Sequence, residues 1–224
     1  MEVFRFSNAI KFAFISIVFF ILSFTNLAYS NSPAQADYLL ERGRQYFSDR
    51  DFNRAVQCFR ESAEIGNEAA QLCLALCYVK GLGVECNDAE AFKWFKRAAE
   101  SGNADAQLHL ALCYAEGNGV ECNDAEAFKW FKRAAESGNA DAQFGVALSY
   151  VTGCGVERNV AESLKWLKRA AESGNADAQF YVAMCYAKGD GVERNDAEAL
   201  KWLKRAAESG NTDAQEILKK TGNY

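Results

Sequence analysis

One long segment occurs twice in this chain without change, and this repetition constrains the fold more than any other feature. The segment GVECNDAEAFKWFKRAAESGNADAQ runs from Gly83 to Gln107 and again, 36 residues later, from Gly119 to Gln143. Related turns recur with the same period at Ile65, Ser173 and Ser209. A period of this length is typical of a solenoid of helical hairpins, in which repetition extends a surface.

Each unit contains signals for two helices. The first helix begins after Asn103, which can act as its N-cap, and ends at Gly117. The second begins after Asn123, with Glu126 placed to complete a capping-box exchange, and ends at Gly138. The second helix also carries a tryptophan in every full unit, for which we expect a role in packing between repeats. These residues are Trp94, Trp130, Trp166 and Trp202.

The repeated motif resembles a known family. The motif consists of a small residue followed by Tyr three positions later (ALCY, ALSY, AMCY), then GxGV, then AEAFKWFKRAAESGNADAQ. This order is similar to the Sel-1-like repeat, a relative of the tetratricopeptide repeat. The segment Ala36–Glu64 lacks GxGV and has a shorter connection, so it resembles a tetratricopeptide hairpin instead. We therefore expect an all-α fold, a right-handed α-solenoid of antiparallel helix hairpins with about eleven helices.

The expected organisation is an N-terminal signal peptide, a first hairpin, four full repeats and a final capping helix. The corresponding ranges are 1–30 (signal peptide), 31–66 (tetratricopeptide-like hairpin), 67–102, 103–138, 139–174 and 175–210 (Sel-1-like repeats), and 211–224 (capping helix).

The N-terminal segment has the pattern of a cleaved secretory signal. Arg5 and Lys11 precede the apolar run Phe12–Phe24, and small residues lie at the cleavage-site positions of Ala28–Ser30. An uncleaved membrane anchor is the alternative. The expected location is periplasmic or secreted. The formal net charge of −5 disfavours nucleic acid and anionic membrane as partners.

The eight cysteines of an exported chain suggest disulfide bonds. Two units each hold a pair of cysteines nine residues apart, and both partners are absent together from the next unit, where Ser149 and Arg158 replace them. The predicted bridges are Cys77 to Cys86 and Cys113 to Cys122. Two weaker suggestions are Cys58 to Cys73, between consecutive helices, and Cys154 to Cys185, between neighbouring units. The alternative is a set of reduced, buried thiols.

No motif in the sequence indicates catalysis. His109 is the single histidine and lies four residues before Cys113, but one such pair supplies only two of the four ligands that zinc normally needs. The GxGV glycines are explained by a turn rather than by phosphate binding. We expect no enzyme activity, no metal and no cofactor.

The expected binding surface is the concave side of the solenoid. In each full unit the first helix has a small residue at Ala75, Ala111, Ala147 or Ala183, and the apolar residues around it form two parallel rows. The candidate binding residues are Leu72, Leu76, Leu108, His109, Leu112, Phe144, Leu148, Phe180, Tyr181 and Met184. Such rows suit an amphipathic helix or an extended peptide. Alternatively, they pack between successive helices or beneath the last one.

The resemblance implies a non-catalytic scaffold that binds a protein or peptide; we expect a monomer that binds neither nucleic acid nor, once the signal is removed, a membrane. Some cysteine-rich exported members of the family are associated with penicillin binding or weak β-lactam hydrolysis, so a cell-wall-ligand or β-lactam-binding protein is an alternative. In those members cysteines flank the GNADAQ turn, whereas here Ala99 and Gln107 hold these positions. An adaptor of the secretory-pathway lumen is a third reading.

Overall fold

The structure, a computed structural model, describes residues 32–222, and this part of the chain contains eleven helices and no strand. The predicted all-α solenoid is therefore confirmed. The predicted signal peptide, 1–30, lies outside the described residues. The helices are α2 (Pro33–Ser48), α3 (Phe52–Ile65), α4 (Glu68–Lys80), α5 (Asp88–Glu100), α6 (Ala104–Glu116), α7 (Asp124–Glu136), α8 (Ala140–Thr152), α9 (Val160–Glu172), α10 (Ala176–Lys188), α11 (Asp196–Glu208) and α12 (Thr212–Thr221).

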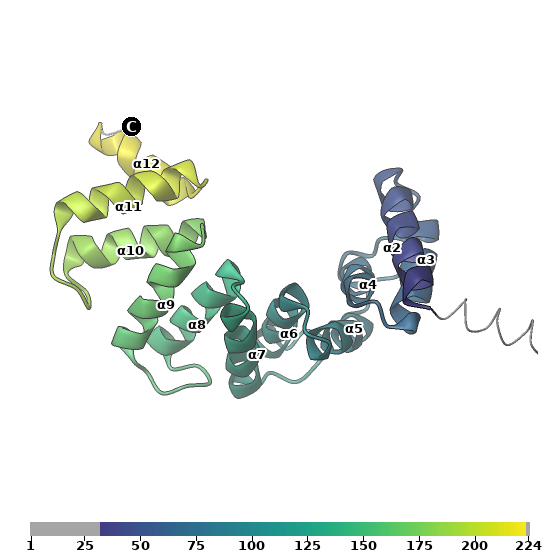
Figure 1. Cartoon of the computed structure of the whole chain (residues 1–224). Helices are drawn as coiled ribbons and strands as arrows, with labels where there is room; N and C mark the ends of the chain where they lie inside the picture. Colours follow the sequence, from purple (N-terminus) through teal and green to yellow (C-terminus); the bar gives the residue numbers. More distant parts are fainter. Residues whose placement is uncertain (1–31, 223–224) are drawn as a thin grey trace, which may run out of the picture.

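Successive helices pack on one another along the chain. The first helix of each hairpin is here called an A helix (α2, α4, α6, α8 and α10, with α12 in the same position at the end), and the second a B helix (α3, α5, α7, α9 and α11). The hairpins follow an open arc, with α4, α6 and α8 toward its inner side and α5, α7 and α9 toward its outer side (Figure 1).

Asparagine side chains begin every helix from α4 onward. The Asn103 side chain accepts a hydrogen bond from the Ala106 N–H at the start of α6, as expected for an N-cap. Asn123 caps α7 in the same way, but the reciprocal half of the predicted capping box is absent. The Asn123 N–H donates to the Tyr114 carbonyl at 2.8 Å, and the Glu126 carboxylate pairs with Lys129 at 3.1 Å.

The core consists of alanines where helices approach closely and larger apolar side chains between them. Ala111, Ala147, Leu110 and Val146 of the A helices are fully buried. Trp130 and Trp166 are only 6% and 9% exposed and belong to the central cluster, which confirms their expected packing role. Each tryptophan carries an arginine guanidinium over its ring, such as Arg133 at 4.7 Å from Trp130.

The second glycine of the loop between A and B helices is required by close contact with the preceding hairpin. Gly119 has φ +73°, and a Cβ at this position would lie 2.1 Å from the carbonyl oxygen of Asp88, the first residue of α5. Gly83 and Gly155 make the corresponding approach to α3 and α7. In three of the four full repeats the GxGV motif thus brings the loop against the B helix of the preceding unit.

None of the described helices combines the length and the hydropathy that crossing a bilayer requires.

Candidate functional site

The ten predicted binding residues all lie on A helices, at positions that share one face of each helix. They are called the helix-A rows below. None of them belongs to the fully buried core: eight are half-buried, while Leu148 and Tyr181 are 39% and 46% exposed. The neighbouring core positions, such as Val146 and Ala147, are 0% exposed. The rows therefore pack on the core from outside and keep part of their apolar surface open.

The structure brings the C-terminal members of the rows into one aromatic group. The Tyr181 ring lies 5.6 Å from Phe144 of the preceding A helix and 5.9 Å from Phe180. Met184 faces the end of the solenoid, where it lines a cavity of about 240 Å³ with Ile217 of α12. The rows are thus continuous from α8 to α10, and α12 closes their end.

The His109 ring packs against the neighbouring repeat. Its ring is stacked on Phe95 of the preceding B helix, with ring centres 4.9 Å apart and planes at 18°. Burial lowers the pKa of His109 below its ordinary value; Asp105 opposes this shift and Lys80 adds to it. In residues 32–222 no three His, Cys, Asp or Glu side chains gather closely enough to hold a metal ion.

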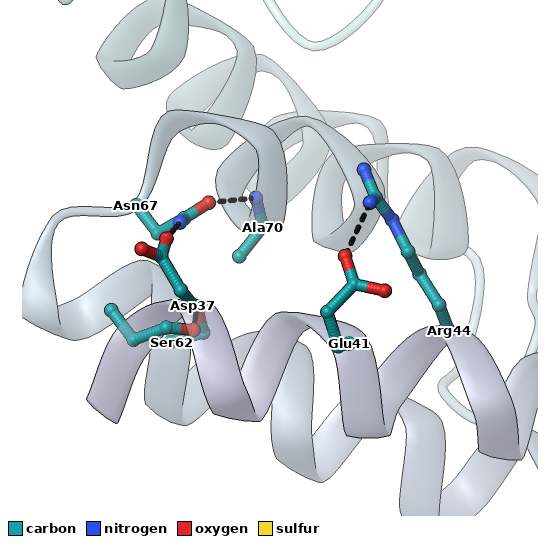
Figure 2. A network of polar contacts seen from close by, with 7 residues as sticks. Asp37, Glu41, Arg44, Ser62, Asn67 and Ala70 are labelled. Carbon is teal, nitrogen blue, oxygen red and sulfur yellow. Dashed lines mark hydrogen bonds and ion pairs between the residues drawn. The ribbon is translucent and has the colours of Figure 1, made fainter. Parts of the chain in front are cut away.

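Neighbouring A helices are joined by a hydrogen bond that the sequence analysis did not anticipate. The amide of Asn139, the cap of α8, donates to the Asp105 carboxylate of α6 at 2.9 Å. The same bond, at 2.8 Å, joins Asn67, the cap of α4, to Asp37 of α2, as Figure 2 shows. The recurring Asn and Asp were visible in the sequence, but each was interpreted within its own helix. Equivalent bonds join α8 to α10 and α10 to α12, whereas α4 and α6 lack one.

All eight cysteines are free thiols in the structure. Cys77 and Cys113 are buried in A helices, while their predicted partners, Cys86 and Cys122, are exposed in the loops that follow. Burial raises the pKa of Cys77 and Cys113 to about 11.

The other cysteines are dispersed. Cys58 lines a shallow pocket beside Arg42, whereas Cys73 lines a different pocket beside Arg44. Cys154 is exposed in the loop before α9, and Cys185 is half-buried in α10. The predicted bridges remain predictions.

A pocket that was not predicted from the sequence lies at the N-terminal end of the rows, between α2 and α4. It holds about 290 Å³ and is lined by Leu76 of the rows together with Arg44, Phe47 and Phe59. An alignment of the first hairpin on Tyr46 and Tyr78 places Arg44 at the position of Leu76, which was the available signal.

Comparison with known proteins gives a consistent result. The family model described as Sel1 repeat matches residues 26–67, 69–103, 104–139, 140–175 and 176–211. The first match includes the hairpin that was compared above with a tetratricopeptide repeat. The first match begins five residues before the expected hairpin, and the other repeat boundaries differ by one or two residues from those expected. No curated protein is similar enough to the chain to count as a match.

Two solved structures resemble the chain closely. A Sel1 repeat protein from Oxalobacter formigenes is 34% identical, with a TM-score of 0.77 over 84% of this chain and 76% of the other. A protective antigen of uropathogenic Escherichia coli strains, displaying an SLR fold, is 37% identical with a TM-score of 0.77, over 85% of this chain but 41% of that longer one. The chain therefore belongs to the Sel1 repeat family, whose members are typically scaffolds for protein–protein interaction.

Proposed function

We propose that this chain is an exported, non-catalytic scaffold that binds a protein or peptide along the helix-A rows. The observation that carries the proposal is that all ten residues of these rows keep part of their apolar surface exposed, along one face of four successive A helices. Apolar side chains held at fixed spacing by rigid helices provide binding area without the entropic cost of ordering a loop. The A helices α4, α6 and α8 lie toward the inner side of the arc, where one ligand can contact several repeats (Figure 1).

The substitution Leu148→Asp tests this proposal, with Val160→Asp as its matched control. Leu148 and Val160 are 39% and 46% exposed, so both changes place a charge at a similarly open site. Val160 begins α9, away from the rows, and the equivalent residues of the other full repeats are Asp88, Asp124 and Asp196. The control is therefore compatible with folding, since acidic residues are favourable in the first turn.

Partners captured from the exported fraction and identified by mass spectrometry supply the ligand for this test. Leu148→Asp is expected to weaken binding about tenfold or more, a loss of at least ~1.4 kcal/mol, with circular dichroism and melting nearly unchanged. Val160→Asp should bind like the natural chain. If both variants bind the partner equally well, the proposal that the partner binds the helix-A rows is wrong.

Export has its own test. The apolar N-terminal run predicts that the intact mass of the exported product begins at Asn31, within a few residues. A full-length chain recovered from the membrane fraction would contradict this part of the proposal.

A further inference from the structure

The pocket between α2 and α4 has an apolar interior. Phe59 of α3, only 2% exposed, lies at its base, with Phe47, Leu76 and Cys73 around it. The Phe59 ring fits against Gly43 of α2 so closely that a Cβ there would lie 2.6 Å from two ring carbons. The volume of the pocket, about 290 Å³, is at the low end for ligand sites, which hold roughly 300–1,000 Å³. A space of this size suits one side chain rather than a whole cofactor.

The pocket differs from the equivalent sites of the next two repeats. In the next repeat the residue equivalent to Phe59 is Phe95, and the His109 ring covers it at 4.9 Å. Cys73 occupies the position of His109 in α4 and is too short to cover Phe59 in this way. In the repeat after that, the equivalent Phe131 ring itself lies against Gly145, within 2.9 Å of where a Cβ would be. The chain thus fills this site in two repeats and leaves it open in the first.

Two cations line the pocket. The Arg44 guanidinium pairs with the Glu41 carboxylate at 2.6 Å, so its charge is largely compensated (Figure 2). The Lys80 side chain, at the C-terminal end of α4, is exposed and makes no ion pair with any residue of the described part of the chain. The pocket therefore has a positive edge on a chain whose net charge is −5. An incoming carboxylate would be attracted to this edge.

We propose that this pocket, the anchor pocket, receives one apolar side chain of an acidic peptide segment, with a carboxylate next to that side chain paired to Lys80. The inference rests on the proposed function, because it specifies the chemistry of the segment that the helix-A rows bind. An apolar side chain in a desolvated pocket supplies most of the energy in such an interface, and the adjacent charge pair supplies orientation.

A display library of random short peptides, selected on the purified chain, provides the probe. Peptides that bind are expected to share an apolar residue flanked by Asp or Glu. Their affinities are then measured for the natural chain and for Cys73→His, which gives α4 the residue that α6 already carries in front of Phe95. This variant fills the pocket with a side chain compatible with the fold. Affinity is expected to fall about tenfold or more.

Charge reversal tests the second half of the proposal. Lys80→Glu should weaken binding several-fold, and less so at high salt, because the interaction with a carboxylate is screened. The matched control is Lys96→Glu on the B helix α5, which is equally a charge reversal at an exposed lysine and should change nothing. Both sites are exposed, so neither variant endangers folding.

The outcomes are distinguishable. One outcome would overturn the anchor pocket and leave the proposed function standing. In it, the selected peptides bind the Leu148→Asp variant more weakly than the natural chain, but bind the Cys73→His and Lys80→Glu variants with unchanged affinity. A consensus without acidic residues would also overturn it. If the library yields no peptide that binds above background, the anchor pocket fails, while the proposed function is decided separately by the partners captured from the exported fraction.

Discussion

At the scale of single residues, five of the eight cysteines represent two extremes of accessibility. Cys77 and Cys113 are buried and have their pKa raised to about 11, so they are almost entirely protonated at neutral pH. Cys86, Cys122 and Cys154 are exposed. In the reduced protein, iodoacetamide at neutral pH is therefore expected to modify the exposed group first and the buried pair slowly, as measured by peptide mass spectrometry over time.

The same two buried cysteines are the ones predicted to form bridges in the exported protein. Non-reducing peptide mapping should find Cys77 joined to Cys86 and Cys113 joined to Cys122. Each closed loop is short, so reduction is expected to cost about 2–3 kcal/mol per bridge at most and to leave the helices intact. Labelling of all eight thiols after denaturation without a reductant would show that no bridge exists.

The residue scale also shows where sequence reasoning stops. The N-cap role of Asn103 could be predicted because it depends on the three residues that follow. The capping box at Glu126 could not be excluded, because its competitor, the Tyr114 carbonyl, comes from the other helix of the hairpin. Likewise, the stacking of His109 on Phe95 joins side chains from two repeats. Local patterns predict local bonds, and these contacts are not local.

At the scale of elements, the loop glycines provide a matched pair. Gly119 and Gly191 have nearly the same φ, +73° and +72°, so alanine is equally strained at both. A Cβ at Gly119 would lie 2.1 Å from the Asp88 oxygen, whereas at Gly191 the nearest heavy atom is 3.5 Å away. Gly191→Ala should cost about 1–2 kcal/mol from backbone strain alone. Gly119→Ala should cost about 3 kcal/mol or more, because it adds a clash between hairpins. Equal losses in urea unfolding would contradict this explanation of the GxGV motif.

The asparagine caps provide a second pair. Asn139 caps α8 and also binds Asp105, whereas Asn103 caps α6 but has Ala69 where the aspartate would be. Asn103→Ala is expected to cost about 1 kcal/mol, the usual value for a lost cap. Asn139→Ala should cost about 1 kcal/mol more, because it also removes a hydrogen bond to a charged group. Urea unfolding measures both. An Asn103→Ala variant as unstable as Asn139→Ala would show that the bond between repeats contributes nothing.

At the scale of the whole molecule, repetition made most of the fold predictable. The period, the caps and the GxGV loops define two helices per unit, and each unit needs its neighbours to bury its core. The final helix was also expected, and α12 buries Ala214 and Leu218 in a cluster with Ala206 and Ala207 of α11. The anchor pocket was not predictable from the period, because it depends on departures from it: Cys73 is small and Arg44 replaces a leucine of the rows.

The central claim is that a partner binds the A helices and not the B helices. Hydrogen–deuterium exchange of the chain, with and without a saturating selected peptide, tests this claim most directly. With the ligand bound, backbone amides of α4, α6, α8 and α10 are expected to exchange more slowly, and those of α5, α7 and α9 are expected to change little. In the Leu148→Asp variant the slower exchange of the A helices should be lost. Protection confined to the B helices, or unchanged in Leu148→Asp, would contradict it.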